Sequence, residues 1–85
     1  MLLEIYSIRD SKSEVFTQPF FQLTAGEAER NFQTLVNDPK STQYSYPEDF
    51  ALFKLAKYDD QTGKITPLDQ PQHICNAVQL KRNVQ

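Results

Sequence analysis

Residues 49–58 constrain the fold more than any other part of the sequence, because they predict a β-strand that is apolar on both faces. Side chains alternate between the two faces of a strand. One face would carry Phe50, Leu52, Ala56 and Tyr58, and the other would carry Ala51, Phe53 and Leu55. Each face needs a cover, and a chain of 85 residues has little material from which to supply two.

The length of the chain predicts a single domain over residues 1–85. A domain of this size buries roughly 60% of the surface that the unfolded chain exposes, so a disulfide, a metal or a partner subunit often adds stability. Cys75 is the only cysteine, which excludes an intrachain disulfide and predicts a free structural thiol in a reducing compartment. His73 is close by, but no further Cys or His completes a metal site, and we expect neither metal nor cofactor.

The charge balance argues against a protein that holds duplex DNA through its overall electrostatic field. Nine Lys and Arg residues are outnumbered by eleven Asp and Glu residues, which gives a net charge of −2. Binding of nucleic acid would then depend on a local basic patch or on aromatic stacking with single strands. We find no signal peptide and no segment with the length of a membrane span, so we expect a soluble, intracellular protein.

One helix is predicted over residues 25–37. Thr24 and Glu27 form a T-x-x-E capping box, which satisfies free backbone N–H groups at a helix start. The sequence N-D-P at 37–39 ends the helix, because a residue before proline resists the α conformation. Helical spacing places four apolar residues on one stripe: Ala28, Phe32, Leu35 and Val36.

Two more strands are predicted over residues 2–9 and 64–67, which are rich in β-branched or apolar residues. The polar segment 59–64 predicts a hairpin turn in which Gly63 is available for a positive φ angle. A calcium-binding loop starting at the Asp pair of this turn is disfavoured, because Gln61, Gly63 and Gln70 occupy three ligand positions. The predicted fold class is therefore α+β, with one amphipathic helix packed on a mixed or antiparallel sheet of about three strands.

Two segments leave alternatives open. Residues 10–23 contain Pro19, which excludes a central strand or helix interior there, and their three phenylalanines either pin a loop to the core or stack on a ligand. The tail 71–80 fits either an alternating strand or a helical stripe, and we favour a short helical turn after Pro71. The three phenylalanines of residues 10–23 are Phe16, Phe20 and Phe21.

The sequence argues against an enzyme. The two glycines, Gly26 and Gly63, do not lie in a phosphate-binding loop. His73 and Cys75 would share a face of a strand, but no nucleophile motif surrounds them. Neighbouring carboxylates occur in predicted turns, where they solvate the chain.

Several short motifs together resemble a known family. They are I-Y-S-I-R-D-S-K at 5–12, P-F-F at 19–21, N-D-P at 37–39, P-E-D-F-A-L at 47–52 and D-D-Q-T-G at 59–63. In this order and spacing they are similar to the small nonstructural protein of gokushoviruses, which are single-stranded DNA phages of the family Microviridae. The resemblance covers nearly the whole chain.

The resemblance implies a phage protein that is made in the cytoplasm of the bacterial host and is absent from the virion. It implies an accessory role in replication or packaging of the single-stranded DNA genome, and it brings no catalytic residues. Two hypotheses follow. The protein contacts single-stranded DNA directly, or it is a protein–protein adaptor to the replication protein or procapsid without DNA contact.

The candidate stacking platform is one face of the sheet, bearing either Phe50, Tyr58 and Lys54 or Phe53 and Lys57. Since one helix covers only one face, we also predict a homodimer, unless residues 71–80 fold back over the other face. The candidate nucleic-acid-binding residues are Arg9, Lys12, Lys54, Lys57, Tyr58, Lys81 and Arg82.

Overall fold

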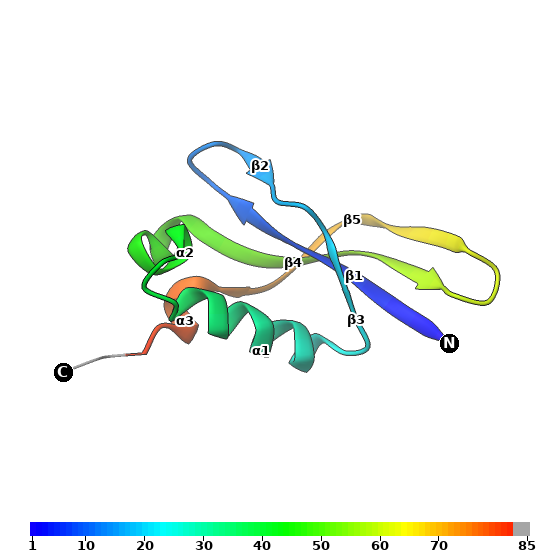
Figure 1. Cartoon of the computed structure of the whole chain (residues 1–85). Helices are drawn as coiled ribbons and strands as arrows, with labels where there is room; N and C mark the ends of the chain where they lie inside the picture. Colours follow the sequence, from blue (N-terminus) through cyan, green and yellow to red (C-terminus); the bar gives the residue numbers. More distant parts are fainter. Residues whose placement is uncertain (83–85) are drawn as a thin grey trace.

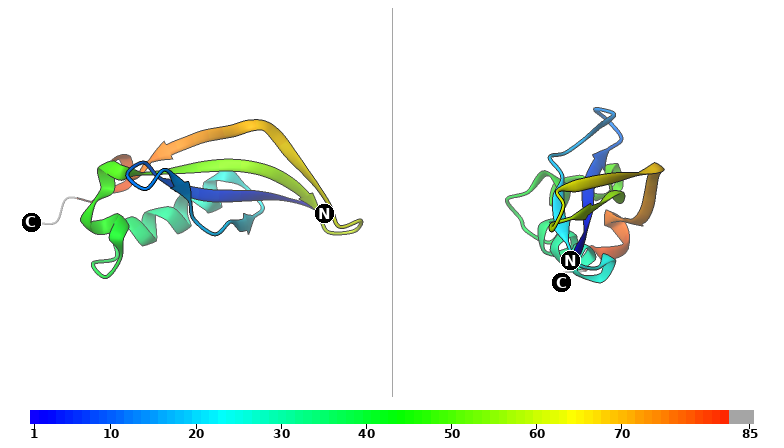
Figure 2. Two further views of the ribbon diagram at one scale, coloured as in Figure 1. Left: turned by 90° about the horizontal axis from the view of Figure 1, so that it is seen from above. Right: turned by 90° about the vertical axis from the view of Figure 1, so that its right-hand side faces the viewer.

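The computed structural model describes residues 1–82, which form an elongated antiparallel sheet curled into a half-barrel, with short helices on one side (Figures 1 and 2). Strands account for 45% of these residues and helices for 28%. The strands are β1 (Leu2–Asp10), β2 (Val15–Phe16), β3 (Phe20–Gln22), β4 (Phe50–Asp59) and β5 (Lys64–Asn76). The helices are α1 (Ala25–Val36), α2 (Thr42–Ser45), the 3-10 turn η1 (Pro47–Asp49) and α3 (Ala77–Leu80).

The sheet contains five strands in the order β2-β1-β4-β5, and β3 pairs with β1 on the same edge as β2. The predicted fold class, one helix on about three strands, is therefore wrong. The predicted loop 10–23 contributes two very short strands, since β2 and β3 pair with successive parts of β1. Pro19 lies in the gap between them, where its missing N–H breaks no ladder bond.

The second difference from the prediction is the length of β5. This strand runs from Lys64 to Asn76 and passes through Pro67 and Pro71, although the sequence predicted that it would end at the first proline. Proline is tolerated because β5 is an edge strand whose outer side needs no hydrogen bonds. The register shifts by several residues at 68–71, and the strand bends sharply there (Figure 2).

A β-bulge in β4 changes which side chains share a face. Tyr6 pairs with Lys54, whereas the preceding Ile5 pairs with Ala56, so that Leu55 is the extra residue. Before the bulge, Phe50, Leu52 and Lys54 lie on the helix side of the sheet; after it, Lys57 does. The predicted assignment of faces is correct from Phe50 to Phe53 and wrong for Ala56 and Tyr58, because it assumed unbroken alternation along the strand. Tyr58 shares a face with Phe53, not with Phe50.

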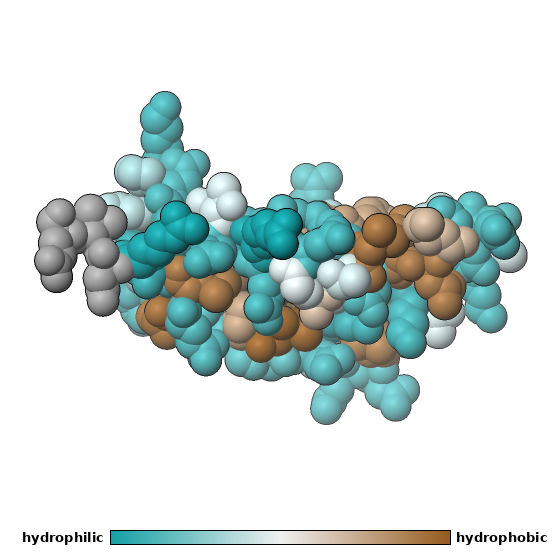
Figure 3. Space-filling view, turned by 90° about the horizontal axis from the view of Figure 1, so that it is seen from below, coloured by the Kyte–Doolittle hydropathy of each residue, from teal (hydrophilic) through white to brown (hydrophobic). Residues whose placement is uncertain are grey.

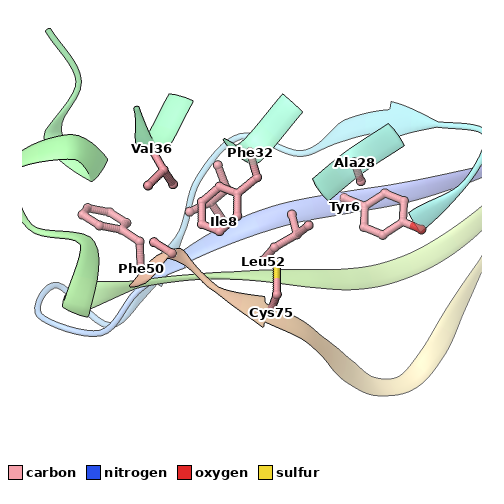
Figure 4. Close-up of a cluster of buried hydrophobic side chains, with 9 residues drawn as sticks. Tyr6, Ile8, Ala28, Phe32, Val36, Phe50, Leu52 and Cys75 are labelled. Carbon is pink, nitrogen blue, oxygen red and sulfur yellow. The ribbon is translucent and has the colours of Figure 1, made fainter. Parts of the chain in front are cut away.

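Helix α1 confirms the sequence prediction over Ala25–Val36. Thr24 is the N-cap, and its Oγ1 accepts a hydrogen bond from the backbone N–H of Glu27 at 3.2 Å. The predicted apolar stripe faces the sheet and forms the core with residues of β1, β4, β5 and α3 (Figure 4). The buried residues of this core are Tyr6, Ile8, Ala28, Phe32, Val36, Phe50, Leu52, Cys75 and Ala77.

The C-terminal segment does not cover the second face of β4. Residues 71–76 continue β5 beside β4, and only Ala77–Leu80 form the helical turn. Ala77 is fully buried in the same core that α1 closes. The alternative in which residues 71–80 fold back over the other face is therefore wrong. No helix within residues 1–82 is long and apolar enough to cross a membrane.

Candidate functional site

The sheet has one face without a helix, which we call the helix-free face. Its centre is closed, because Ile5, Ser7 and Ala56 are buried there. Exposed aromatic and apolar side chains therefore lie in two separate groups, one toward each end of the strands.

The first group, the aromatic row, consists of Phe16, Phe53 and His73. The ring centroids of Phe16 and Phe53 lie 5.5 Å apart, and those of Phe53 and His73 lie 5.4 Å apart, both nearly perpendicular. The Arg9 guanidinium lies 6.0 Å from the centroid of the Phe16 ring. The row thus joins three aromatic rings and one permanent cation across four strands of the sheet.

Strand pairing sets the position of each ring. Phe16 pairs with Arg9, and Phe53 pairs with both Ser7 and His73. The fully buried Ser7 donates a hydrogen bond from Oγ to the backbone oxygen of Thr17 at 2.6 Å. Thr17 Oγ1 in turn accepts from the backbone N–H of Ile8 at 3.2 Å. These bonds hold the end of β2 against β1, so Phe16 is fixed although its strand is short.

A small hollow of about 180 Å³ opens at the end of the aromatic row. His73 Nε2 lies 2.8 Å from Asn76 Oδ1 at its margin, which orients the imidazole ring. Ring faces, one guanidinium, an amide and two carboxylates therefore meet at this end of the sheet. The polar and aromatic residues that line the hollow include Arg9, Glu48, Asp49, Phe53, His73 and Asn76.

The second group, the apolar end, lies near the start of β1. Leu3, Tyr58 and Ile65 pair across β1, β4 and β5, and the ring of Phe21 meets that of Tyr58 at a centroid distance of 5.4 Å. Phe21 is 48% exposed and Ile65 is 56% exposed. Figure 3 views the molecule from below, the side on which Figure 1 places α1, and there too apolar atoms gather near this end. This group contains no charged side chain.

A larger hollow of about 500 Å³ lies between the β1–β2 turn and the segment of α2 and η1. Three carboxylates and one lysine line it, so its charge does not suit an anionic ligand. Its lining residues are Asp10, Lys12, Thr42, Tyr46, Glu48, Asp49 and Phe50.

One of the two predicted lysines of β4, Lys54, forms an ion pair within the protein. Lys54 Nζ lies 2.6 Å from Glu4 Oε2, and the two side chains are only 14% and 24% exposed. The Tyr6 hydroxyl donates a hydrogen bond to the other oxygen of Glu4. The bonds from Lys54 and Tyr6 lower the pKa of Glu4, whereas burial and the neighbouring carboxylate raise the pKa of Tyr6. This network lies on the helix side of the sheet.

The other predicted cations are scattered. Lys57 is exposed on the helix side, and Lys12 lies in the β1–β2 turn. Lys81 Nζ lies 3.3 Å from the centroid of the Tyr44 ring and donates a hydrogen bond to the Tyr44 backbone oxygen. Arg82 is the next residue, so both cations lie at the opposite end of the molecule from the apolar end. Of the seven predicted residues, only Arg9 and Tyr58 lie on the helix-free face, one in each group.

Sequence reasoning missed Ser7, Thr17 and Asn76 as parts of this surface. Their roles depend on pairing between strands that are distant in the sequence, and the alternation of any single strand does not show it. His73 and Cys75 also differ from the prediction. The register shift at Ile74 puts His73 on the helix-free face and Cys75 in the core, where burial raises the pKa of the thiol to about 11.

Among residues 1–82, we find no group of three or more His, Cys, Asp and Glu side chains that could hold a metal ion. The free thiol of Cys75 is buried among apolar side chains, consistent with a structural role. The aromatic row of the helix-free face therefore offers aromatic stacking, hydrogen bonding and one guanidinium, with the carboxylates of Glu48 and Asp49 in the adjoining hollow.

Comparison with protein families identifies the relatives of this chain. The profile of the family described as "Phage ORF5 protein" matches residues 3–80. The chain belongs to the phage ORF5 protein family. This membership confirms the predicted phage origin. No curated protein and no solved structure matches the chain.

Proposed function

We propose that this phage ORF5 family protein is a non-enzymatic accessory of single-stranded DNA genome replication or packaging, and that it contacts single-stranded DNA through the aromatic row. We further propose that it acts in the cytoplasm of the bacterial host and is absent from the virion. The observation that carries the proposal is the chain of rings Phe16, Phe53 and His73 beside Arg9 on the helix-free face.

The row suits unpaired bases better than duplex DNA. Phe16 is 39% exposed and His73 is exposed, so their rings are open to a base that is not already stacked in a helix. Stacking of a base on an aromatic side chain contributes about 1–3 kcal/mol and tolerates any base. Arg9 supplies a guanidinium for a neighbouring phosphate. Duplex binding would need a broader basic surface, which a net charge of −2 does not favour.

Titration of the protein into a fluorescently labelled single-stranded oligonucleotide tests the proposal. Phe16→Ala should weaken binding by roughly 5- to 150-fold, the equivalent of one lost stacking contact of about 1–3 kcal/mol. Tyr46→Ala is the control, because Tyr46 is an exposed aromatic residue that does not belong to the row and does not line the hollow at its end. It should bind as the wild type does.

The salt dependence of the same binding separates stacking from charge. A single strand gives a slope of log K against log salt of about −0.7 for each neutralised phosphate, so we expect a slope of roughly −0.7 to −1.4. Arg9→Gln should make the slope less negative by about 0.7. Lys57→Gln should leave it unchanged, because Lys57 lies on the helix side. Equal effects of both variants would contradict the assignment.

The alternative function is an adaptor to the replication protein or procapsid without direct DNA contact. The scattered cations favour it, since Lys54 is bound to Glu4 and Lys81 lies against Tyr44. Folded wild-type protein that shows no oligonucleotide binding at low salt would exclude the DNA proposal and leave the adaptor.

A further inference from the structure

The apolar end is a surface without a cover in the described chain. Leu3, Tyr58 and Ile65 form a cross-strand ladder, and Phe21 packs edge-on against Tyr58. The neighbouring Leu2 lies on the opposite face of β1 and is also exposed, as is Leu23 beyond β3. Apolar side chains therefore surround this end of the sheet. Contiguous patches of this kind are uncommon on monomeric proteins and mark interfaces.

The helices lie on the opposite face of the sheet, and they do not extend to this end. Helix α1 begins only at Ala25, and its buried residues pack on Tyr6, Ile8 and Leu52, further along the strands. α3 adds its cover at the far end of α1, and the hairpin of β4 and β5 projects beyond both helices (Figure 1). The projecting hairpin thus presents its apolar side chains to the outside.

The charges around the apolar end are balanced in sign. Asp59 and Lys64 lie opposite each other in the strand register of the hairpin. The N-terminal ammonium forms a 2.9 Å ion pair with Asp60. A rim with charges of both signs is complementary to itself, because a two-fold axis can bring Lys64 of one copy near an aspartate of the other. It offers no net field for a strongly acidic or strongly basic partner.

Edge-to-edge strand pairing is a poorer way to join two copies. One edge of the sheet consists of the very short strands β2 and β3, and the long edge is β5, from which Pro67 and Pro71 remove two N–H donors. The bend at 68–71 also breaks the flat edge that another strand would need. The face of the hairpin, in contrast, offers continuous apolar side chains.

From these observations we propose that the apolar end is the interface of a homodimer, in which Phe21, Tyr58 and Ile65 of one copy pack against the same residues of a second copy. The partner is a second chain because the patch is apolar, its rim is self-complementary and a small domain without disulfide gains stability from such burial. The interface lies at the opposite end of the helix-free face from the aromatic row, so the proposal is independent of DNA binding.

Sedimentation equilibrium over a range of micromolar concentrations tests the proposal. The wild type should have a mass near twice that of the 9.9 kDa chain. Ile65→Lys should halve this mass, because it places a charge at the centre of the interface. Ile65 is exposed in the single chain, so the variant should keep its fold, and circular dichroism checks this.

The matched control is Val78→Lys. Val78 is 51% exposed and lies on α3, away from the apolar end, so the same kind of change should leave the dimer intact. A wild type that stays monomeric at all concentrations would overturn the proposal. A dimer that survives Ile65→Lys, or that is lost equally in Val78→Lys, would overturn the location of the interface.

Discussion

Replacement of Asn37 tests how the C-terminal segment is held. Asn37 is the C-cap of α1, and its Nδ2 donates hydrogen bonds to the backbone oxygens of Gln33 at 2.8 Å and Leu80 at 3.0 Å. Its Oδ1 accepts from the backbone N–H of Arg82 at 2.8 Å. One side chain therefore joins the end of α1 to residues more than forty positions later in the sequence.

The three bonds set the expected magnitude for Asn37→Ala. Each intramolecular hydrogen bond contributes about 0.5–1.5 kcal/mol, and the three together would give about 3 kcal/mol. Water can reach the released carbonyl oxygens, because the site is only partly buried, which reduces the loss to about 1.5–3 kcal/mol. For a domain of this size, each kcal/mol lowers the melting temperature by about 4–8 °C.

Urea denaturation measures this loss, and hydrogen exchange locates it. The amides of Lys81 and Arg82 should exchange faster in Asn37→Ala. The exchange of the β4 amides should change only as much as the lower free energy of global unfolding requires. Asn31→Ala is the control, because Asn31 is an exposed residue on the same helix. If both variants unfold at the same urea concentration, the side chain of Asn37 does not hold the tail and our account of it is wrong.

Three further predictions concern the helix and the ion pair. Thr24→Ala should lower the free energy of unfolding by roughly 0.5–2 kcal/mol, and an unchanged denaturation midpoint would exclude Thr24 as the N-cap. Phe32→Ala should cost about 3–5 kcal/mol because Phe32 is 1% exposed, and Leu35→Ala, which is only partly buried, should cost less in the same assay. Since the pKa of Glu4 is lowered in the folded state, its stabilising contribution is present above the normal pKa and is lost as the pH falls through the folded pKa. When the pH is lowered, the free energy of unfolding should therefore fall less steeply in Lys54→Met than in the wild type. Identical pH profiles of the two proteins would contradict this role of the ion pair.

The sequence was sufficient for elements that have a strong period of their own. The cap at Thr24 and the stripe of Phe32 and Val36 predicted α1, and the hairpin turn was predicted from its polar residues and Gly63, whose φ angle is 76°. β2 and β3 could not be predicted, because two or three residues beside Pro19 have no period and become strands only through pairing with β1.

The candidate site was harder to predict for the same reason. The lysines and tyrosine of β4 were placed by simple alternation, and the bulge at Leu55 invalidates alternation beyond that point. Phe16 was recognised as too apolar for a solvated loop, but its neighbours Phe53 and His73 come from strands that are distant in the sequence. A local pattern contains no information on such neighbours.

The bulge at Leu55 makes the length of β4 adjustable at one position only. Lys54 and Ala56 keep their partners on both neighbouring strands, whereas Leu55 has none on either side. Deletion of Leu55 would leave every other pair and every face of β4 as they are, at the cost of local twist. Deletion of Phe53 or Lys57 would instead move one part of the strand to the wrong face. Length variation among relatives of this chain is therefore expected at this position of the strand, and a thermal unfolding comparison of the three deletions would show whether the strand has this tolerance.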